Sequence, residues 1–109
     1  MATLTVQDIV LTGLNPSYVV SAVGGDEFAN DGKTFIHVKN GHTSAWVVTV
    51  DSVAPCSQGY DHNAVVSIPA SGERIIGPFD KHRFDDSAGK VQITYDGVTV
   101  LTIAAIRLP

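Results

Sequence analysis

The chain has 109 residues, a length that fits one domain with one hydrophobic core. Hydrophobic residues make up 44% of it and charged residues 17%, a balance that excludes a disordered chain. The net charge is −4 and the seven Lys and Arg residues stand singly, so we expect neither nucleic acid nor a membrane as a partner.

The single cysteine, Cys56, cannot form a disulfide within the chain. No apolar run approaches the roughly 20 residues that span a bilayer, and no charged segment followed by a long apolar one opens the chain. We therefore expect a soluble protein that is made in a reducing compartment.

The first expected element lies between Leu4 and Gly13. Thr5 can cap a helical turn with Asp8 three residues later, and Gly13 can end it. The alternative is a strand over residues 3–6, because β-branched residues dominate there. We favour the helical turn, so residues 1–15 are predicted to form an N-terminal helical turn or arm.

From Tyr18 onward, short β-branched and aromatic runs alternate with turn residues. The predicted strands cover residues 18–22, 34–39, 45–53, 64–68, 73–76, 91–95 and 98–108. Gly24-Gly25 is interpreted as a loop, and not as a phosphate site, because the following Asp26-Glu27 would repel a phosphate. Asn40-Gly41 and Asp96-Gly97 suit two-residue hairpin turns, so each predicts that the strands it joins are antiparallel neighbours.

This pattern predicts an all-β fold, an antiparallel β-sandwich or jelly roll of about seven to eight short strands in one domain, residues 1–109. In the strand 34–39, Thr34, Ile36 and Val38 share one face. The last strand, residues 98–108, is apolar on both faces. It is therefore either central in a sheet or covered by another subunit.

Several residue groups could carry chemistry. Cys56, Asp61 and His62 share one loop and would need a further ligand such as His82 to hold zinc. Asp80, Asp85 and Asp86 could bind calcium, but cations are interleaved with them. In both cases a solvated polar loop is the favoured interpretation, so no metal site and no catalytic site is predicted.

The aromatic residues offer a third possibility, a sugar-stacking platform formed by Trp46 with Tyr18, Tyr60 and Tyr95. Trp46 begins a strand of alternating pattern, which is more typical of a core anchor. We therefore favour a structural role for Trp46.

Three stretches together resemble a known family. They are residues 30–41 (NDGKTFIHVKNG), residues 72–79 (GERIIGPF) and residues 103–109 (IAAIRLP). The set is similar to a family of small virion proteins of tailed bacteriophages and prophages, whose nearest functional description is the capsid decoration or cement protein. Each stretch consists of turns and strands, so the resemblance implies no catalytic residue and no cofactor.

The resemblance implies a non-enzymatic protein on the capsid exterior, made in the cytoplasm of the bacterial host, that binds the assembled major capsid protein. Such proteins are commonly homo-oligomers on symmetry axes, so a trimer is favoured over a dimer. The apolar N-terminal segment and last strand are the expected contact surface, with membership of the core as the alternative. The residues concerned are Leu4, Val6, Ile9, Val10, Leu101, Ile103, Ala105, Ile106 and Leu108.

Two other functions stay open from the sequence. One is a structural protein of the head–tail junction or the tail. The other, of a different class, is a carbohydrate- or metal-binding β-sandwich module on the particle surface.

Overall fold

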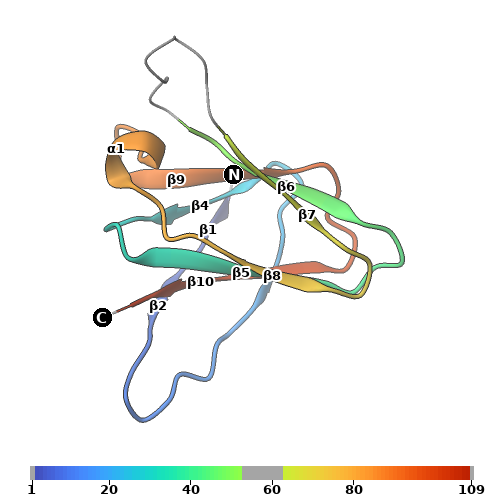
Figure 1. Cartoon of the computed structure of the whole chain (residues 1–109), viewed down its shortest axis with the longest axis horizontal. Helices are drawn as coiled ribbons and strands as arrows, with labels where there is room; N and C mark the ends of the chain where they lie inside the picture. Colours follow the sequence, from blue (N-terminus) through green and yellow to red (C-terminus); the bar gives the residue numbers. More distant parts are fainter. Residues whose placement is uncertain (1, 53–62, 109) are drawn as a thin grey trace.

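The structure, a computed structural model, describes residues 2–52 and 63–108 (Figure 1). These residues form two sheets and one short helix, α1 (Lys81–Phe84). Sheet A contains, in order across the sheet, β1 (Ala2–Thr3), β4 (Asp26–Ala29), β9 (Lys90–Tyr95), β6 (Trp46–Val50) and β7 (Ala64–Ile68). Sheet B contains β2 (Val6–Asp8), β10 (Leu101–Arg107), β5 (Thr34–Asn40) and β8 (Glu73–Ile76), and β3 (Val19–Val20) also pairs with β10.

The two sheets pack face to face, and in Figure 1 the strands β4 and β9 of sheet A lie above β5 and β10 of sheet B. Neighbouring strands are antiparallel except for the pairs β1–β4 and β2–β10, which are parallel. The molecule measures 38 × 35 × 20 Å. The predicted all-β fold with two packed sheets is confirmed, and each of the seven predicted strand regions contains a strand. The purely antiparallel arrangement is wrong, because the N-terminal strands β1 and β2 pair in parallel and make both sheets mixed.

The core lies between the sheets and is built by the period of two along each strand. In β5, Thr34, Ile36 and Val38 are fully buried, as the alternation predicts. The strands β6, β9 and β10 contribute the same kind of inward side chain to the core: Val48, Val50, Val91, Ile93, Leu101, Ile103 and Ala105.

The last strand is central in sheet B. Along one edge β10 pairs with β5 over its whole length, from Leu101 opposite Asn40 to Arg107 opposite Thr34. Its other edge is shared, because β3 pairs with the first half and β2 with the second. This position explains the two apolar registers, since Ala104 and Ile106 on the outer face are also buried.

The N-terminal helical turn is wrong, because residues 2–8 form β1 and β2 instead. The segment crosses from the edge of sheet A to the edge of sheet B, and Leu4 is buried at the crossing. Both sheets have an open edge here, so the backbone gains inter-strand hydrogen bonds that a single helical turn could not match. Gly13 ends no helix, but it has a positive φ of 99° in a turn closed by its N–H and the carbonyl of Val10.

The strand β4 is not among the predicted strands. In β4, Asp26 and Phe28 both point into the sandwich and both are buried. The buried carboxylate of Asp26 accepts hydrogen bonds from the hydroxyl of Tyr95 and the backbone N–H of Ala22. These partners make the burial of a charged residue tolerable, and a single sequence does not reveal them.

The two predicted hairpins are also wrong. Asn40-Gly41 connects β5 of sheet B to β6 of sheet A, and Asp96-Gly97 connects β9 of sheet A to β10 of sheet B. Neither glycine has a positive φ, so no type I′ turn forms. The glycines serve close approach instead: a Cβ on Gly97 would overlap the ring of Trp46, and one on Gly41 would lie 2.8 Å from Cγ1 of Val100.

Candidate interaction surface

The predicted contact residues separate into core and surface. Leu4, Leu101, Ile103 and Ala105 belong to the core of the chain itself, and Ile106 is 7% exposed on the outer face of sheet B. Val6 and Ile9 are half-buried. Only Val10 and Leu108 are exposed, so in this conformation they are the members of the set most available to a partner.

The exposed apolar surface gathers instead around one charge-free segment. No charged residue occurs between Asp8 and Asp26 in the sequence. Of the exposed large apolar side chains that the structure describes, five lie in this segment, and the full set is Val10, Leu11, Val19, Val20, Val23, Val65, Ile75, Val100 and Leu108. The predicted contact set does not include Leu11, Val20 or Val23, although the gap in charge is visible in the sequence.

This surface follows the side of β10 that faces away from β5, where β2 and β3 pair with it. At the start of β10, Val20 lies opposite Thr102, and Val100 immediately precedes the strand. At its end, the N–H of Ile9 donates to the carbonyl of Arg107, which brings Leu108 beside the segment that carries Val10. We call this the β10 edge: Val10, Leu11, Val19, Val20, Val23, Val100 and Leu108.

A hollow of about 360 Å³ lies in the middle of the β10 edge, where β2 and β3 approach the same strand from opposite ends. Its lining combines apolar side chains and backbone from β10 with hydroxyl and amide groups at the rim, and contains no charged residue. The lining residues are Thr3, Leu4, Thr5, Gln7, Ser17, Val19, Ile103, Ala104 and Ala105.

Residues 9–18 form the loop between β2 and β3, and its two ends are held together at the rim of this hollow. The side chain of Gln7 donates from Nε2 to the carbonyl of Ser17 (2.9 Å) and accepts from the N–H of Ser17 (2.8 Å). Leu11 lies at the exposed turn of the loop, which projects away from the two sheets (Figure 1). We call these two hydrogen bonds the amide clamp. It holds the ends of the loop together, so that the loop stays exposed instead of packing onto the sheet.

Ion pairs fix the far end of the β10 edge. Arg107 donates from Nε to Asp8 (2.7 Å) and approaches Asp31 at 3.7 Å, and the contact with Asp8 raises the pKa of Arg107. Asp31 accepts hydrogen bonds from the N–H of Lys33 and the hydroxyl of Thr34. These bonds, with the nearby charge of Arg107, lower the pKa of Asp31 below its usual 3.8.

Tyr18 covers the outer face of sheet B next to this edge. Its hydroxyl lies 2.6 Å from Nδ1 of His37, and Nζ of Lys39 is 4.2 Å from the centre of its ring. Nε2 of His37 lies 3.5 Å from the carboxylate of Glu73. Opposite His37 in the neighbouring strand is Ala104, whose small side chain leaves room for the ring to cross the sheet.

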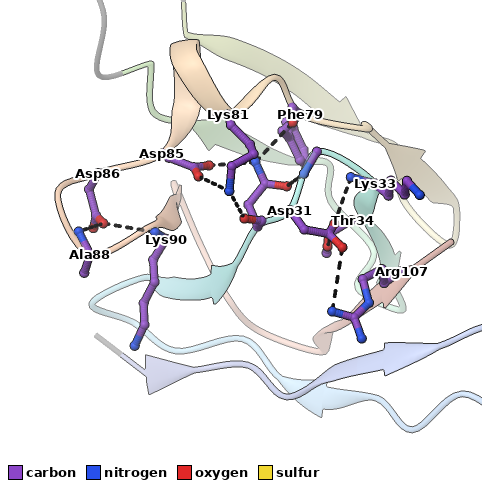
Figure 2. Close-up of polar contacts among 12 residues, drawn as sticks. Asp31, Lys33, Thr34, Phe79, Lys81, Asp85, Asp86, Ala88, Lys90 and Arg107 are labelled. Carbon is purple, nitrogen blue, oxygen red and sulfur yellow. Dashed lines mark hydrogen bonds and ion pairs between the residues drawn. The ribbon is translucent and has the colours of Figure 1, made fainter. Parts of the chain in front are cut away.

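The acidic residues near α1 are occupied by contacts within the chain (Figure 2). Asp85 accepts from the buried amide of Asn30 at 2.7 Å and lies 3.4 Å from Nζ of Lys81. Asp86 accepts from the N–H groups of Lys90 and Ala88 and from the side chain of Gln92, and these bonds lower its pKa. The arrangement favours a structural turn over the calcium alternative.

The residues named for zinc mostly fall outside the described part of the chain. Cys56, Asp61 and His62 lie in the range 53–62, and the side chain of His82 is likewise not described. Among the side chains that the structure describes, no group of three His, Cys, Asp or Glu residues is placed to hold a metal. In the described residues, no helix is long and apolar enough to cross a membrane.

Trp46 is partly buried, and its ring makes several contacts inside the molecule. His42 stacks on one side with ring centres 5.1 Å apart, and Gly97 lies against the ring as well. The indole N–H donates to the carbonyl of Thr99 at 3.0 Å. Trp46 thus seals one end of the core, which agrees with an anchor and leaves little ring surface for a sugar.

The other aromatic residues proposed for the sugar-stacking platform make their contacts elsewhere in the molecule. Tyr95 is tied to the buried carboxylate of Asp26, and burial together with that contact raises the pKa of Tyr95 well above its usual 10. Tyr18 is engaged with His37 on the outer face of sheet B, and Tyr60 lies outside the described residues. The described aromatic residues do not form one platform.

Comparison of the chain with models of known protein families, with curated proteins and with solved structures found no match.

Proposed function

We propose that the chain is a non-enzymatic structural protein of a bacteriophage virion, a capsid decoration protein that binds the assembled major capsid protein as a homo-oligomer on the capsid exterior. The observation that carries the proposal is the β10 edge, which has exposed apolar side chains at both ends of one strand, most of them in the charge-free segment between Asp8 and Asp26. Contiguous exposed apolar surface of this kind marks a protein contact. It adds to the family resemblance of residues 30–41, 72–79 and 103–109.

The order of the strands supports a jelly roll as the finer description of the sandwich. From β3 to β10 the strands fall in sheets B, A, B, A, A, B, A and B, with antiparallel neighbours β3-β10-β5-β8 and β4-β9-β6-β7. Two interleaved Greek keys produce this order, and jelly rolls are frequent in viral capsid and lectin domains. On this description β1 and β2 are parallel additions at the sheet edges.

The outer face of sheet A suits the side turned toward solvent. Glu27 pairs with Lys90 at 3.2 Å, and Thr49 lies opposite Thr94. A protein bound through the β10 edge would keep this polar face exposed. Binding that favours the assembled lattice over free capsid subunits stabilises the shell by mass action.

The test has two parts. Mass spectrometry of purified virions is expected to find the chain in hundreds of copies, as icosahedral symmetry implies. Purified protein should also sediment with capsids that lack it, and Val100→Asp should weaken that binding. Val100 has φ 53°, a conformation that Asp tolerates better than Val, so this substitution spares the fold.

Val65→Asp is the matched control, because Val65 is equally exposed on β7 of sheet A, away from the β10 edge. It should bind capsids like the wild type. A chain that is absent from virions and does not bind capsids would overturn the proposal. A copy number of about six to twelve would instead support the head–tail junction or tail. Glycan binding or stoichiometric metal in the purified protein would support the surface-module alternative.

A further inference from the structure

The β10 edge contains two uncharged features that match each other in polarity. One is the hollow between β2 and β3, with Leu4, Ala104 and Val19 among its lining. The other is Leu11, which is fully exposed at the turn of the loop. An aliphatic side chain in water and the apolar lining of a hollow both gain free energy when they meet.

Leu11 does not fill the hollow of its own chain. The loop leaves and returns at the rim, where Gln7 and Ser17 are joined by two hydrogen bonds. Leu11 lies in the turn that the N–H of Gly13 closes with the carbonyl of Val10, and its side chain is fully exposed. Reaching back would require the loop to lose the clamp that holds its ends.

The distribution of charge favours a second copy of the chain as the occupant. Two copies that each carry a net charge of −4 repel one another, so they meet best through surfaces without charged side chains. The lining of the hollow has no charged residue, and neither has the loop from Ile9 to Tyr18. A contact between them brings no like charges face to face.

We propose that the hollow of one copy receives Leu11 of a second copy, so that the loop and the hollow form the contact of the homo-oligomer. The two surfaces are different patches of the chain, and such head-to-tail contacts close into rings when the rotation permits. The inference deepens the proposed function and rests on it for where the oligomer acts. Val20, Val23 and Val100, at the other end of β10, stay available for the capsid.

The experiment measures the native mass of the whole protein over a range of concentrations, by light scattering and analytical ultracentrifugation. The wild type is expected to self-associate. Leu11→Lys and Val19→Glu should each weaken self-association at least about tenfold, because each places an unpaired charge in the contact. If Val19→Glu does not fold, Thr5→Glu at the exposed rim is a second variant that places a negative charge at the hollow.

The decisive experiment mixes Leu11→Lys and Val19→Glu after each has been purified separately. Leu11→Lys places a cation on the loop and Val19→Glu places an anion in the hollow, and these two charges meet only between two chains. The mixture should therefore recover association that neither variant shows alone. Ile75→Lys is the control, because Ile75 is exposed on β8 at the opposite edge of sheet B, and it should leave the native mass unchanged.

A wild type that stays a single chain up to about 1 mM would overturn the inference, since a weaker contact has no structural meaning here. An oligomer that Leu11→Lys leaves intact, or that Ile75→Lys disrupts equally, would overturn it too. A single chain that still binds capsids refutes the inference but not the proposed function. An oligomer that fails to bind capsids refutes the proposed function but not the inference.

Discussion

The hydroxyl of Tyr18 meets Nδ1 of His37 at 2.6 Å, and this bond ties the chain just before β3 to the middle of β5, across the intervening strand β10. The two residues are 19 positions apart and lie on the face of sheet B that looks away from the core. The ring of Tyr18 also meets the ring of His37 edge-on, with centres 5.5 Å apart. The contact holds the charge-free segment against the sheet.

Tyr18→Phe removes the hydroxyl and keeps the ring. We expect a loss of about 0.5–1.5 kcal/mol in the free energy of unfolding, the usual value for one hydrogen bond. Tyr18→Ala should cost more, because it also removes the ring contacts with His37 and Lys39. Urea denaturation compares the three proteins, and equal stability of Tyr18→Phe and the wild type would contradict the expected role of the hydroxyl.

Gly97→Ala is expected to lower stability by about 1–3 kcal/mol, because the new Cβ would overlap the indole ring of Trp46. In a Trp46→Leu background the same substitution should cost less, since the smaller side chain can move aside. Trp46 is the single tryptophan, so its fluorescence reports the displacement directly. Additive effects in this double-mutant cycle would show that the two residues are not coupled.

Asn40 is 2% exposed, and its amide nitrogen donates to the carbonyls of Ser44, Ile68 and Pro69. Asn40→Ala should cost about 1–3 kcal/mol through the lost hydrogen bonds. Asn40→Asp should be worse, because it turns a carboxylate toward carbonyl oxygens in a buried site. Thermal unfolding near pH 7 tests the order, and an aspartate variant that is more stable than the alanine variant would contradict it.

The lowered pKa values of Asp31 and Asp86 predict how acid changes the free energy of unfolding. The pKa of each carboxyl is lowered in the folded state, for Asp86 chiefly by the N–H of Lys90. Each ionised carboxylate therefore stabilises the folded state at pH values above the pKa of the unfolded chain, which is near 3.8. This stabilisation is lost as the pH falls through the lower pKa of the folded state.

Asp86→Asn should therefore be less stable than the wild type at pH 6, and the difference should be smaller at about pH 2, because the wild-type carboxyl takes up a proton as the pH falls. Urea midpoints at both pH values give the measurement. A difference that stays constant between them would mean that the charge of Asp86 does not contribute. Thr94→Val, a substitution without a titrating group, serves as the control.

Local pattern predicted much of the strand content correctly. Alternation in residues 34–39 identified Thr34, Ile36 and Val38 as inward, and the doubly apolar last strand indicated a central position. Both inferences depend on the period of two, which any extended segment displays in its own sequence. The gap in charge between Asp8 and Asp26 was equally visible, and it marks the β10 edge.

Partner choice could not be predicted in the same way. Asn40-Gly41 and Asp96-Gly97 have the composition of hairpin turns, yet each leads from one sheet to the other. At Gly97 the requirement for glycine comes from the ring of Trp46, a residue distant in the sequence. A dipeptide reports the conformations it tolerates and not the neighbour that approaches it.

The sequence by itself determined that the chain forms short strands around one core, which face of β5 is buried, and which segment lacks charge, because these follow from residue type and period. The tertiary structure alone decided that residues 2–8 join both sheets, that Leu101, Ile103 and Ala105 lie in the core of their own chain, and that Leu11 stands beside a hollow. Each of these features depends on strand edges and side chains that come together from distant parts of the chain. A local sequence pattern does not contain that information.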